Sequence, residues 1–223
     1  MSEALGGAEL VAAGFVLAGG NSSRMGQDKA LTMLGGQMLI ERALETLRKA
    51  KLPVAIAGAR SPLGRFAPVI EDSAVGMGPL GGVYAALASM RAHHAVFLPV
   101  DMPLLPASLL AYLLWHARVT GAVVTVPAVN GYAQTFPAVV ERSALSTLEN
   151  SLRTGNGGCF AAFEAAAKSR GGELRALPVE MLVQPRHVEH PDGLPAALWF
   201  LNVNDPAELA CAEALLEGVH RVS

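Results

Sequence analysis

The sequence predicts an α/β fold: a Rossmann-like, mostly parallel sheet with helices on both of its faces. Short apolar runs, typical of buried strands, alternate along the chain with longer segments in which apolar residues recur at helical spacing. The chain has 223 residues, of which 52% are hydrophobic, so it can bury a core on each side of a sheet. It contains no internal repeat and no clear linker, so we expect a single domain over residues 1–223, with residues 1–10 as a disordered tail.

The first elements are predicted by an apolar run and by the spacing of apolar residues after it. Residues 11–17 form a continuous apolar run, which predicts a buried parallel strand. Between residues 37 and 49, apolar residues recur every three or four positions, which predicts a helix. Pro53 ends the following connection, and residues 54–57 predict a second strand.

The middle of the chain continues the alternation of strand and helix. Residues 58–64 predict a loop, and residues 68–70 predict a short strand. Pro79 suits the first turn of an alanine-rich helix at 80–90. The elements expected next are a core strand at 95–100, a helix at 106–117 and a strand at 122–127.

The last third of the chain is less regular. A glycine-rich run at 155–158 separates two helical segments, and a stretch with three prolines at 184–195 predicts a flexible excursion. Asp205 is expected to cap the final helix. The elements expected here are strands at 135–140, 174–179 and 199–201 and helices at 142–152, 160–168 and 206–217.

Charge and composition argue against nucleic-acid and membrane partners. The formal net charge is −2, and no basic face for nucleic acid is evident. The first residues lack the cationic and apolar regions of a signal peptide, and the longest apolar run, 104–115, is too short to span a bilayer. Cys159 and Cys211 lack metal-binding spacing and are expected to be buried thiols. We therefore expect a cytoplasmic protein.

The most informative feature of the sequence is the loop that follows the first strand. Gly19, Gly20 and Gly26 allow backbone N–H groups to approach a ligand closely. Arg24 and Lys29 add fixed positive charge, and this combination is expected around a polyphosphate. The loop is neither a P-loop, which needs Ser or Thr directly after its lysine, nor a dinucleotide fingerprint, which needs a glycine where Arg24 stands.

The loop from Leu17 to Lys29, Leu-Ala-Gly-Gly-x-Ser-x-Arg-Met-Gly-x-Asp-Lys, resembles the signature loop of the molybdenum cofactor guanylyltransferases. These enzymes belong to the nucleotidyltransferases, which join a nucleoside monophosphate to a phosphorylated acceptor. Relatives that use CTP typically begin Leu-Ala-Ala-Gly, so Gly19 favours the guanylyl branch. The resemblance extends to about residue 216 and implies a sheet of the nucleotidyltransferase type. The residues that it implies for GTP binding are Leu17, Ala18, Gly19, Gly20, Lys29, Asp72, Gly78 and Asp101.

Asp101 is well placed for such a site because it ends a core strand. Ligands of open α/β sheets bind beyond the carboxyl ends of the strands. The segment Pro99-Val100-Asp101-Met102-Pro103 resembles the Pro-x-Asp-x-Pro motif of the family, whose aspartate binds Mg²⁺. The resemblance implies Mg²⁺ as cofactor with Asp101 as its ligand, and Lys29, Arg24 and Asp101 as the catalytic residues. A turn built on Asp-x-Pro is the alternative explanation.

Two further segments are expected near the nucleoside. The resemblance places Asp72, which follows the short strand at 68–70, beside the nucleoside, together with the glycine-rich turn at 78–82. A carboxylate can accept hydrogen bonds from N–H groups on the edge of guanine. The chain departs from the family at Ala57-Gly58, where an asparagine often contacts the nucleotide, and at 153–158, where a further cation is usual.

Three amides are expected on the acceptor side. Gln134 matches a glutamine or histidine often found at its position, and residues 202–206, Asn-Val-Asn-Asp-Pro, resemble the family's Asn-x-Asn-Thr-Pro segment. Asn202 and Asn204 occupy alternate positions of an extended segment and point the same way, which suits the metal shell or the acceptor phosphate. Helix-cap and turn chemistry, with Asp205 as the cap, explains the same residues equally well.

Together these observations predict guanylyl transfer from GTP to molybdopterin or its molybdenum form, with release of pyrophosphate. The acceptor phosphate is already ionised, so positioning and electrostatic stabilisation suffice without a protein nucleophile. Two alternatives stay open: a relative that uses CTP or a sugar-phosphate acceptor, and a non-catalytic nucleotide-binding accessory protein. The expected protein partners are those of molybdenum cofactor biosynthesis or chaperones of molybdoenzymes, and nucleic acid is not expected to bind.

Overall fold

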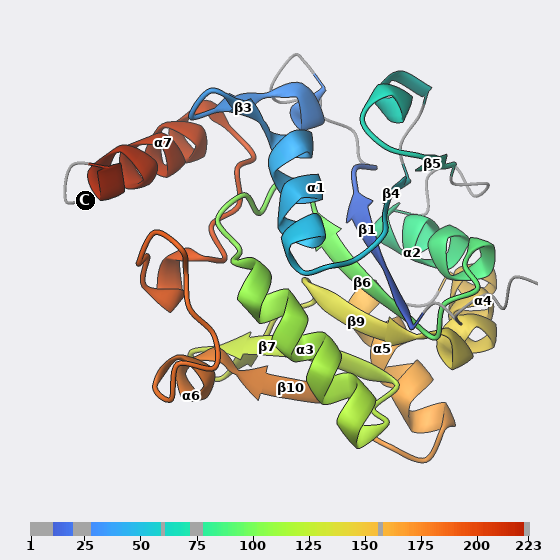
Figure 1. Cartoon of the computed structure of the whole chain (residues 1–223). Helices are drawn as coiled ribbons and strands as arrows, with labels where there is room; N and C mark the ends of the chain where they lie inside the picture. The colour runs from blue at the N-terminus through green and yellow to red at the C-terminus, as the bar shows by residue number, and fades with distance from the viewer. Residues whose placement is uncertain (1–10, 20–27, 59–60, 72–77, 156–157, 221–223) are drawn as a thin grey trace, which may run out of the picture.

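A computed structural model of the chain describes residues 11–19, 28–58, 61–71, 78–155 and 158–220, so the expected tail at 1–10 lies outside it. These residues build an eight-stranded sheet with the order β5-β4-β1-β6-β9-β7-β10, in which the short β8 pairs with β7 (Figure 1). The strands are β1 (Ala12–Leu17), β4 (Val54–Ala57), β5 (Val69–Ile70), β6 (His94–Pro99), β7 (Val124–Val129), β8 (Tyr132–Ala133), β9 (Ala138–Glu141) and β10 (Arg175–Pro178).

The sheet is mostly parallel, which confirms the predicted fold class. β1 pairs in parallel with β4 on one side and with β6 on the other, from Ala12 opposite His94 to Leu17 opposite Pro99. β9 is antiparallel to both of its neighbours, β6 and β7. From β1 the chain moves outward through β4 to β5 and then returns to β6 on the other side of β1. The carboxyl ends of β1 and β6 therefore flank the topological switch point, where ligands of such sheets bind.

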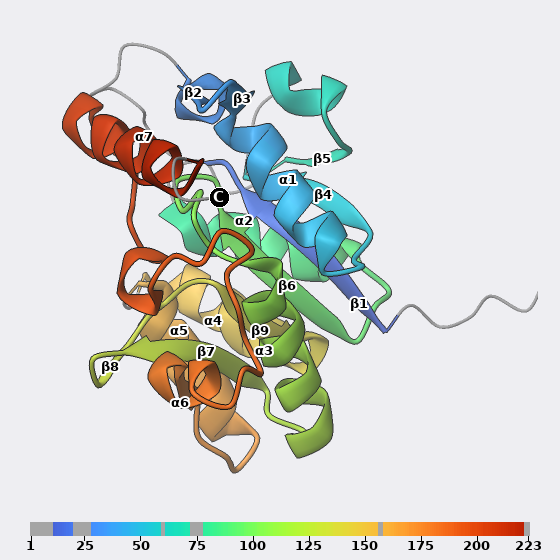
Figure 2. The same ribbon diagram turned by 60° about the vertical axis from the view of Figure 1, so that its left-hand side comes forward.

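Helices cover both faces of the sheet, as predicted (Figures 1 and 2). α1, α3 and α6 lie on one face, and α2, α4 and α5 lie on the other. α7 lies at the margin, beside the small hairpin of β2 (Met33–Leu34) and β3 (Gln37–Met38) (Figure 2). The helices are α1 (Leu39–Lys49), α2 (Gly78–Ser89), α3 (Ala107–Thr120), α4 (Leu145–Thr154), α5 (Cys159–Ser169), α6 (Val179–Val183) and α7 (Pro206–His220), with short 3-10 turns η1 (Lys29–Leu31), η2 (Ser61–Arg65), η3 (Arg142–Ala144) and η4 (Ala196–Leu198).

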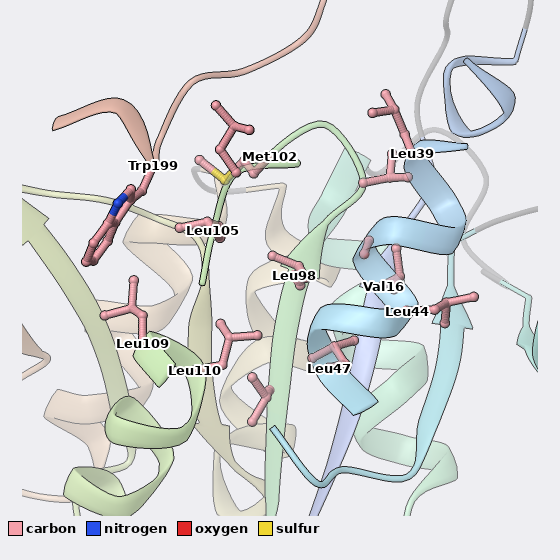
Figure 3. Close-up of a cluster of buried hydrophobic side chains, with 14 of the residues drawn as sticks. Val16, Leu39, Leu44, Leu47, Leu98, Met102, Leu105, Leu109, Leu110 and Trp199 are labelled. Atoms are coloured by element: carbon pink, nitrogen blue, oxygen red, sulfur yellow. The ribbon is translucent and has the colours of Figure 1, made fainter. Parts of the chain in front are cut away.

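The two central strands send alternate side chains into two separate cores. Val16 and Leu98 belong to the cluster beneath α1 and α3 (Figure 3). Phe15 and Phe97, one position earlier on the same strands, belong to the cluster beneath α2, α4 and α5, where their ring centroids are 5.6 Å apart. A slip of one residue would exchange these two sets, so burial on both faces fixes the register of β1 against β6.

The strand expected at 199–201 is wrong. The segment instead continues from the 3-10 turn η4. The Trp199 side chain packs into the core beneath α3, beside Leu105 and Leu109 (Figure 3). Its side chain is buried, and Nε1 donates a hydrogen bond to the carbonyl oxygen of Leu194 at 2.7 Å. Three consecutive apolar residues indicate burial, and here burial comes from packing against a helix rather than from pairing in the sheet.

The helix expected at 37–49 begins two residues later than predicted. Residues 33–38 form the β2–β3 hairpin, whose turn places Gly35 and Gly36 at φ of 57° and 79°. Such positive φ values favour glycine, so this Gly-Gly pair is the signal that marks the turn. A further element, η2, lies within the segment expected to be a loop at 58–64.

The excursion at 184–195 has no helix or strand, as expected, but hydrogen bonds hold it against the N-terminal end of α3. Ser108 Oγ donates to the carbonyl oxygen of Glu189 at 2.6 Å. His190 Nε2 lies 3.1 Å from the carbonyl oxygen of Leu104, and His190 Nδ1 accepts from the N–H of Asp192. Both bonds suit a neutral imidazole protonated at Nε2. Burial lowers the pKa of His190, which also favours the neutral form.

The two cysteines differ in their surroundings. Cys159 is buried as expected, and burial raises the pKa of its thiol to about 12, so it stays protonated near neutral pH. Cys211, on α7, is exposed, which contradicts the expectation of a buried thiol. Within the described part of the chain, every helix is too short or too polar to cross a bilayer.

Trp199→Ala is expected to lower the free energy of unfolding by about 3–5 kcal/mol, because it removes a fully buried indole and leaves a cavity. Urea unfolding followed by circular dichroism measures this loss. Trp115→Ala is the matched control, since Trp115 on α3 is 53% exposed and should cost far less. Equal losses for the two variants would contradict the packing described for Trp199.

Candidate active site

The carboxyl ends of β1, β4 and β6 meet at one edge of the sheet. The N–H of Ala18 donates to the carbonyl oxygen of Ala57 at 3.1 Å, so the chain leaving β1 stays attached to β4. The N–H of Val100 donates to the carbonyl oxygen of Leu17 at 3.1 Å, which holds the chain leaving β6 against β1. Asp101 is the next residue after Val100 and stands two positions beyond the end of β6. It therefore lies at the switch point, as the sequence predicts.

The ammonium group of Lys29 lies at this edge and joins two distant segments. Its Nζ is 2.9 Å from Asp101 Oδ2 and 2.6 Å from Asn204 Oδ1. The side chains of Lys29 and Asp101 are 16% and 26% exposed, so the ion pair is partly shielded from water yet open to a ligand. The structure therefore brings together three residues, at positions 29, 101 and 204, that the sequence analysis took from three separate motifs of the resemblance.

Local contacts fix the backbone that carries Lys29. Asp28 stands at the N-cap of η1, where its Oδ1 accepts a hydrogen bond from the N–H of Ala30 at 3.1 Å. Ala30 is buried in the core, and the N–H of Thr32 donates to the carbonyl oxygen of Lys29. The last turn of the glycine-rich loop is thus anchored, while the long side chain of Lys29 extends toward Asp101.

Asn204 is held in place from two sides. The N–H of the neighbouring Val203, which is fully buried, donates to the backbone carbonyl oxygen of Asp101 at 2.9 Å. The N–H of Asn204 itself donates to Glu208 Oε2 at 2.6 Å. Asp205 Oδ1 accepts from the N–H of Glu208 at 2.9 Å, which confirms Asp205 as the cap of α7. Cap and site thus coexist, because Asp205 serves the helix while the Asn204 side chain turns to Lys29.

Three glycines pack backbone against backbone beside this edge. A Cβ on Gly19 would overlap the carbonyl oxygen of Gly58, at the end of β4. A Cβ on Gly82, in α2, would lie 3.3 Å from both Cα and N of Gly58. The Ala57-Gly58 pair that replaces the family's asparagine therefore gains a structural role. It lets Gly19, which follows β1, and Gly82 of α2 both pack against the end of β4.

The remaining predicted residues divide into two groups. Gly20, Arg24 and Asp72 lie outside the described residues. Gly78 begins α2 with φ of 61°, Ala18 lies between β1 and Gly19, and Asn202 precedes the buried Val203. Gln134 follows β8 at the same edge of the sheet, where its side chain donates to the carbonyl oxygen of Tyr132 at 3.1 Å.

Sequence reasoning missed Glu208 and the role of Val203. Glu208 stands three residues after Asp205, and this Asp-x-x-Glu spacing is a capping-box signal that predicts a carboxylate folded back over the helix start. The signal for Val203 is weaker, because burial of one valine in a polar segment indicates an inward-facing backbone but not which carbonyl it meets.

The site suits a divalent cation that is held chiefly by its substrate. Among the described residues, no group of three or more His, Cys, Asp or Glu side chains is arranged to hold a metal. However, one oxygen atom of Asp101 and one of Asn204 converge on the Lys29 ammonium, so the protein already directs two oxygen atoms at a positive charge. Mg²⁺ commonly takes one or two carboxylates and completes its shell with phosphates and water, and this donor set fits that pattern.

Comparison with known proteins identifies the family. The model of the MobA-like NTP transferase domain matches residues 14–170, which include Lys29 and Asp101. The chain belongs to this family. It is therefore a nucleotidyltransferase, and enzymes of the MobA-like family generally work with a divalent metal. The match ends before Asn204. The third residue of the Lys29–Asp101–Asn204 cluster therefore lies outside the matched region.

Relatives match most of the chain. The molybdenum cofactor guanylyltransferase of Sinorhizobium fredii is 32% identical over 212 residues, which cover 90% of each chain. That of Rhizobium meliloti is 32% identical over 211 residues, again with 90% of each chain covered. These two proteins are similar to this MobA-like chain over nine-tenths of its length.

Solved structures share the fold. Molybdopterin-guanine dinucleotide biosynthesis protein A from Archaeoglobus fulgidus superposes with a TM-score of 0.73 at 24% identity and covers 92% of this chain and 98% of its own. The 2-C-methyl-D-erythritol 4-phosphate cytidylyltransferase from Thermus thermophilus superposes with a TM-score of 0.63 at 21% identity, over 93% of this chain and 100% of its own. The MobA-like fold is thus shared by proteins named for different nucleotides.

Gly19→Ala is expected to destabilise the protein by about 1–3 kcal/mol, because the new methyl group must push the backbone at Gly19 away from the end of β4. Urea unfolding measures the change. Gly64→Ala is the control, since a Cβ at Gly64 meets no atom within 4 Å and Gly64 has no positive φ. If Gly19→Ala is as stable as Gly64→Ala, the close packing of Gly19 on Gly58 is contradicted.

Proposed function

We propose that this nucleotidyltransferase transfers GMP from GTP to the phosphate of molybdopterin or Mo-molybdopterin, which forms the guanine dinucleotide form of the cofactor and releases pyrophosphate. The observation that carries the proposal is the ion pair between Lys29 and Asp101 at the switch point. Lys29 is the last residue of the glycine-rich loop, and Asp101 follows β6. Similarity to guanylyltransferases over nine-tenths of the chain supports the choice of donor and acceptor.

The reaction exchanges one phosphoanhydride bond for another. An oxygen of the acceptor phosphate attacks the α-phosphorus of GTP in line, and the bond to the β-phosphate breaks with its electron pair leaving on pyrophosphate. Mg²⁺, when bound with the nucleotide at Asp101, neutralises charge on the phosphate oxygens. Lys29 donates hydrogen bonds to the phosphates as negative charge develops on the leaving group. Arg24 adds a second cation to the same loop in this proposal.

The remaining assignments follow from position. We assign the backbone of Leu17, Ala18, Gly19 and Gly20 to the nucleotide, since these residues leave β1 at the switch point. Asp72 and Gly78 are assigned to the nucleoside side. Gln134 and Asn202 are assigned to the acceptor side, because both stand at the carboxyl edge of the sheet. Protein partners are proposed among molybdenum cofactor biosynthesis proteins or molybdoenzyme chaperones, in a cytoplasmic setting.

The nucleotide preference is tested by product formation. Purified protein is incubated with Mg²⁺, with one of GTP, CTP or ATP, and with either molybdopterin or a sugar phosphate as acceptor. The product is identified by its mass, and binding of GTP is measured in parallel by isothermal titration calorimetry. GTP is expected to give the guanine dinucleotide. A cytosine product would instead favour the CTP-using branch, product with a sugar phosphate alone would change the acceptor, and tight GTP binding without turnover on any acceptor would favour an accessory protein.

Lys29→Ala is expected to lower turnover by about two to three orders of magnitude, the scale of losing one preorganised stabilising group. Asp101→Asn should do the same, since it keeps the shape of the side chain but removes the charge that a hard cation needs. Lys49→Ala is the matched control, because Lys49 also pairs with a carboxylate, Glu45 Oε1 at 2.8 Å, but on the exposed surface of α1. Turnover near that of the wild type in Lys29→Ala would remove Lys29 from the mechanism.

A further inference from the structure

The Lys29 ammonium is held by the kind of atoms that would hold a metal. Asp101 supplies a carboxylate oxygen at 2.9 Å, and Asn204 supplies an amide oxygen at 2.6 Å. We propose that Lys29 is a resident cation that occupies the metal position of the nucleotide-free protein and leaves Asp101 when the nucleotide enters with its metal. The inference rests on the proposed nucleotidyl transfer and adds an order of binding to it.

The two oxygen atoms stand on short side chains whose backbones are held by hydrogen bonds, whereas the ammonium group ends a long side chain. Val203 donates its N–H to the backbone of Asp101, and Glu208 accepts the N–H of Asn204, so the two segments are tied to each other and to α7. Lys29 has an anchored backbone, but its charge sits at the end of a flexible four-carbon stem. When the occupant of the position changes, the moving part is therefore the Lys29 side chain.

The charges of the site indicate that the Lys29 ammonium and a metal ion do not bind beside Asp101 at the same time. Asp101 carries one negative charge and Asn204 carries none, and Lys29 already balances that charge. A divalent ion at Asp101 would face the ammonium at a few ångströms and be repelled by it. The triphosphate of a nucleotide removes this conflict, because its oxygens can accept both the metal and the displaced ammonium. Metal is thus expected to bind with the nucleotide rather than before it.

Removal of the Lys29 charge should consequently have opposite effects on two equilibria. In the absence of nucleotide, Lys29→Met frees Asp101 and Asn204 and should tighten metal binding. In the presence of nucleotide, the same variant lacks the ammonium group that contacts the phosphates, so it should bind the metal–nucleotide complex more weakly. A lysine that merely contacted phosphate, without occupying the metal position, would change the second equilibrium and leave the first alone.

The test is a titration of Mn²⁺ into the nucleotide-free protein, with free Mn²⁺ measured by electron paramagnetic resonance at low salt. We expect Lys29→Met to bind Mn²⁺ at least about tenfold more tightly than the wild type, because a neighbouring positive charge is removed. Lys29→Arg keeps the charge and should bind as weakly as the wild type. Lys49→Met, which frees Glu45 on the surface of α1, should not create a comparable site.

The double variant Lys29→Met/Asp101→Asn locates the ion, since it should lose the gain. Affinity in Lys29→Met that equals the wild type would overturn the proposal, and so would a gain that persists in the double variant. Circular dichroism confirms folding, and Lys29→Gln replaces Lys29→Met if the latter does not fold. The titration contains neither GTP nor an acceptor, so its failure leaves the proposed GMP transfer in place. Conversely, failure of the product assay leaves this result interpretable.

Discussion

The ammonium group of Lys29 joins three segments that are far apart in the sequence, and the geometry of the site depends on this contact. η1 brings the lysine, the turn after β6 brings Asp101, and the segment before α7 brings Asn204. Each of these segments is anchored on its own, by the Asp28 cap, by β1 and by Glu208 respectively. The ammonium is the point where the three anchored parts meet. Hydrogen bonds that involve charged groups contribute about 1.5–3 kcal/mol each, enough to favour one arrangement of the segments.

The sheet determines that this meeting occurs at one edge. β1 pairs with β4 and β6 in parallel, so all three strands deliver their loops to the same side. The chain passes from β1 to β4 and β5 on one side of β1 and then to β6 on the other, so the carboxyl ends of β1 and β6 mark the switch point at which ligands of such sheets bind. Gly19 and Gly58, which follow β1 and β4, then bring these two strand ends into backbone contact beside Gly82 of α2. Fold and site are therefore coupled through the carboxyl ends of three strands.

Local patterns in the sequence predicted most of the fold and two members of the cluster. The parallel sheet and its covering helices follow from apolar runs and helical spacing, and Asp101 follows from its place after a core strand. Lys29 follows from the glycine-rich loop. In each case the signal lies within a few consecutive residues.

The remainder depends on contacts between distant segments, which local patterns do not specify. Asn204 was ambiguous because a cap and a site contact use the same residue types, and the Lys29 contact spans 175 positions. The apolar neighbours of Trp199 predict a strand, whereas the core beneath α3 buries the indole. The sequence indicates at Ala57-Gly58 only that the family's asparagine is missing. The packing of Gly58 against Gly19 and Gly82 follows from the three-dimensional structure.

The central claim, that Asp101 and Asn204 share the Lys29 ammonium until a nucleotide takes it, is tested most directly by NMR of the lysine side chains. Protein labelled with ¹³C and ¹⁵N on lysine gives an ammonium signal for Lys29, which is assigned by its loss in Lys29→Arg. We expect Asn204→Ala and Asp101→Asn each to shift this signal in the free protein. We expect the effect of Asn204→Ala to disappear once GTP and Mg²⁺ are bound. A Lys29 signal in the free protein that is unchanged by both substitutions would show that the two residues do not hold the ammonium group.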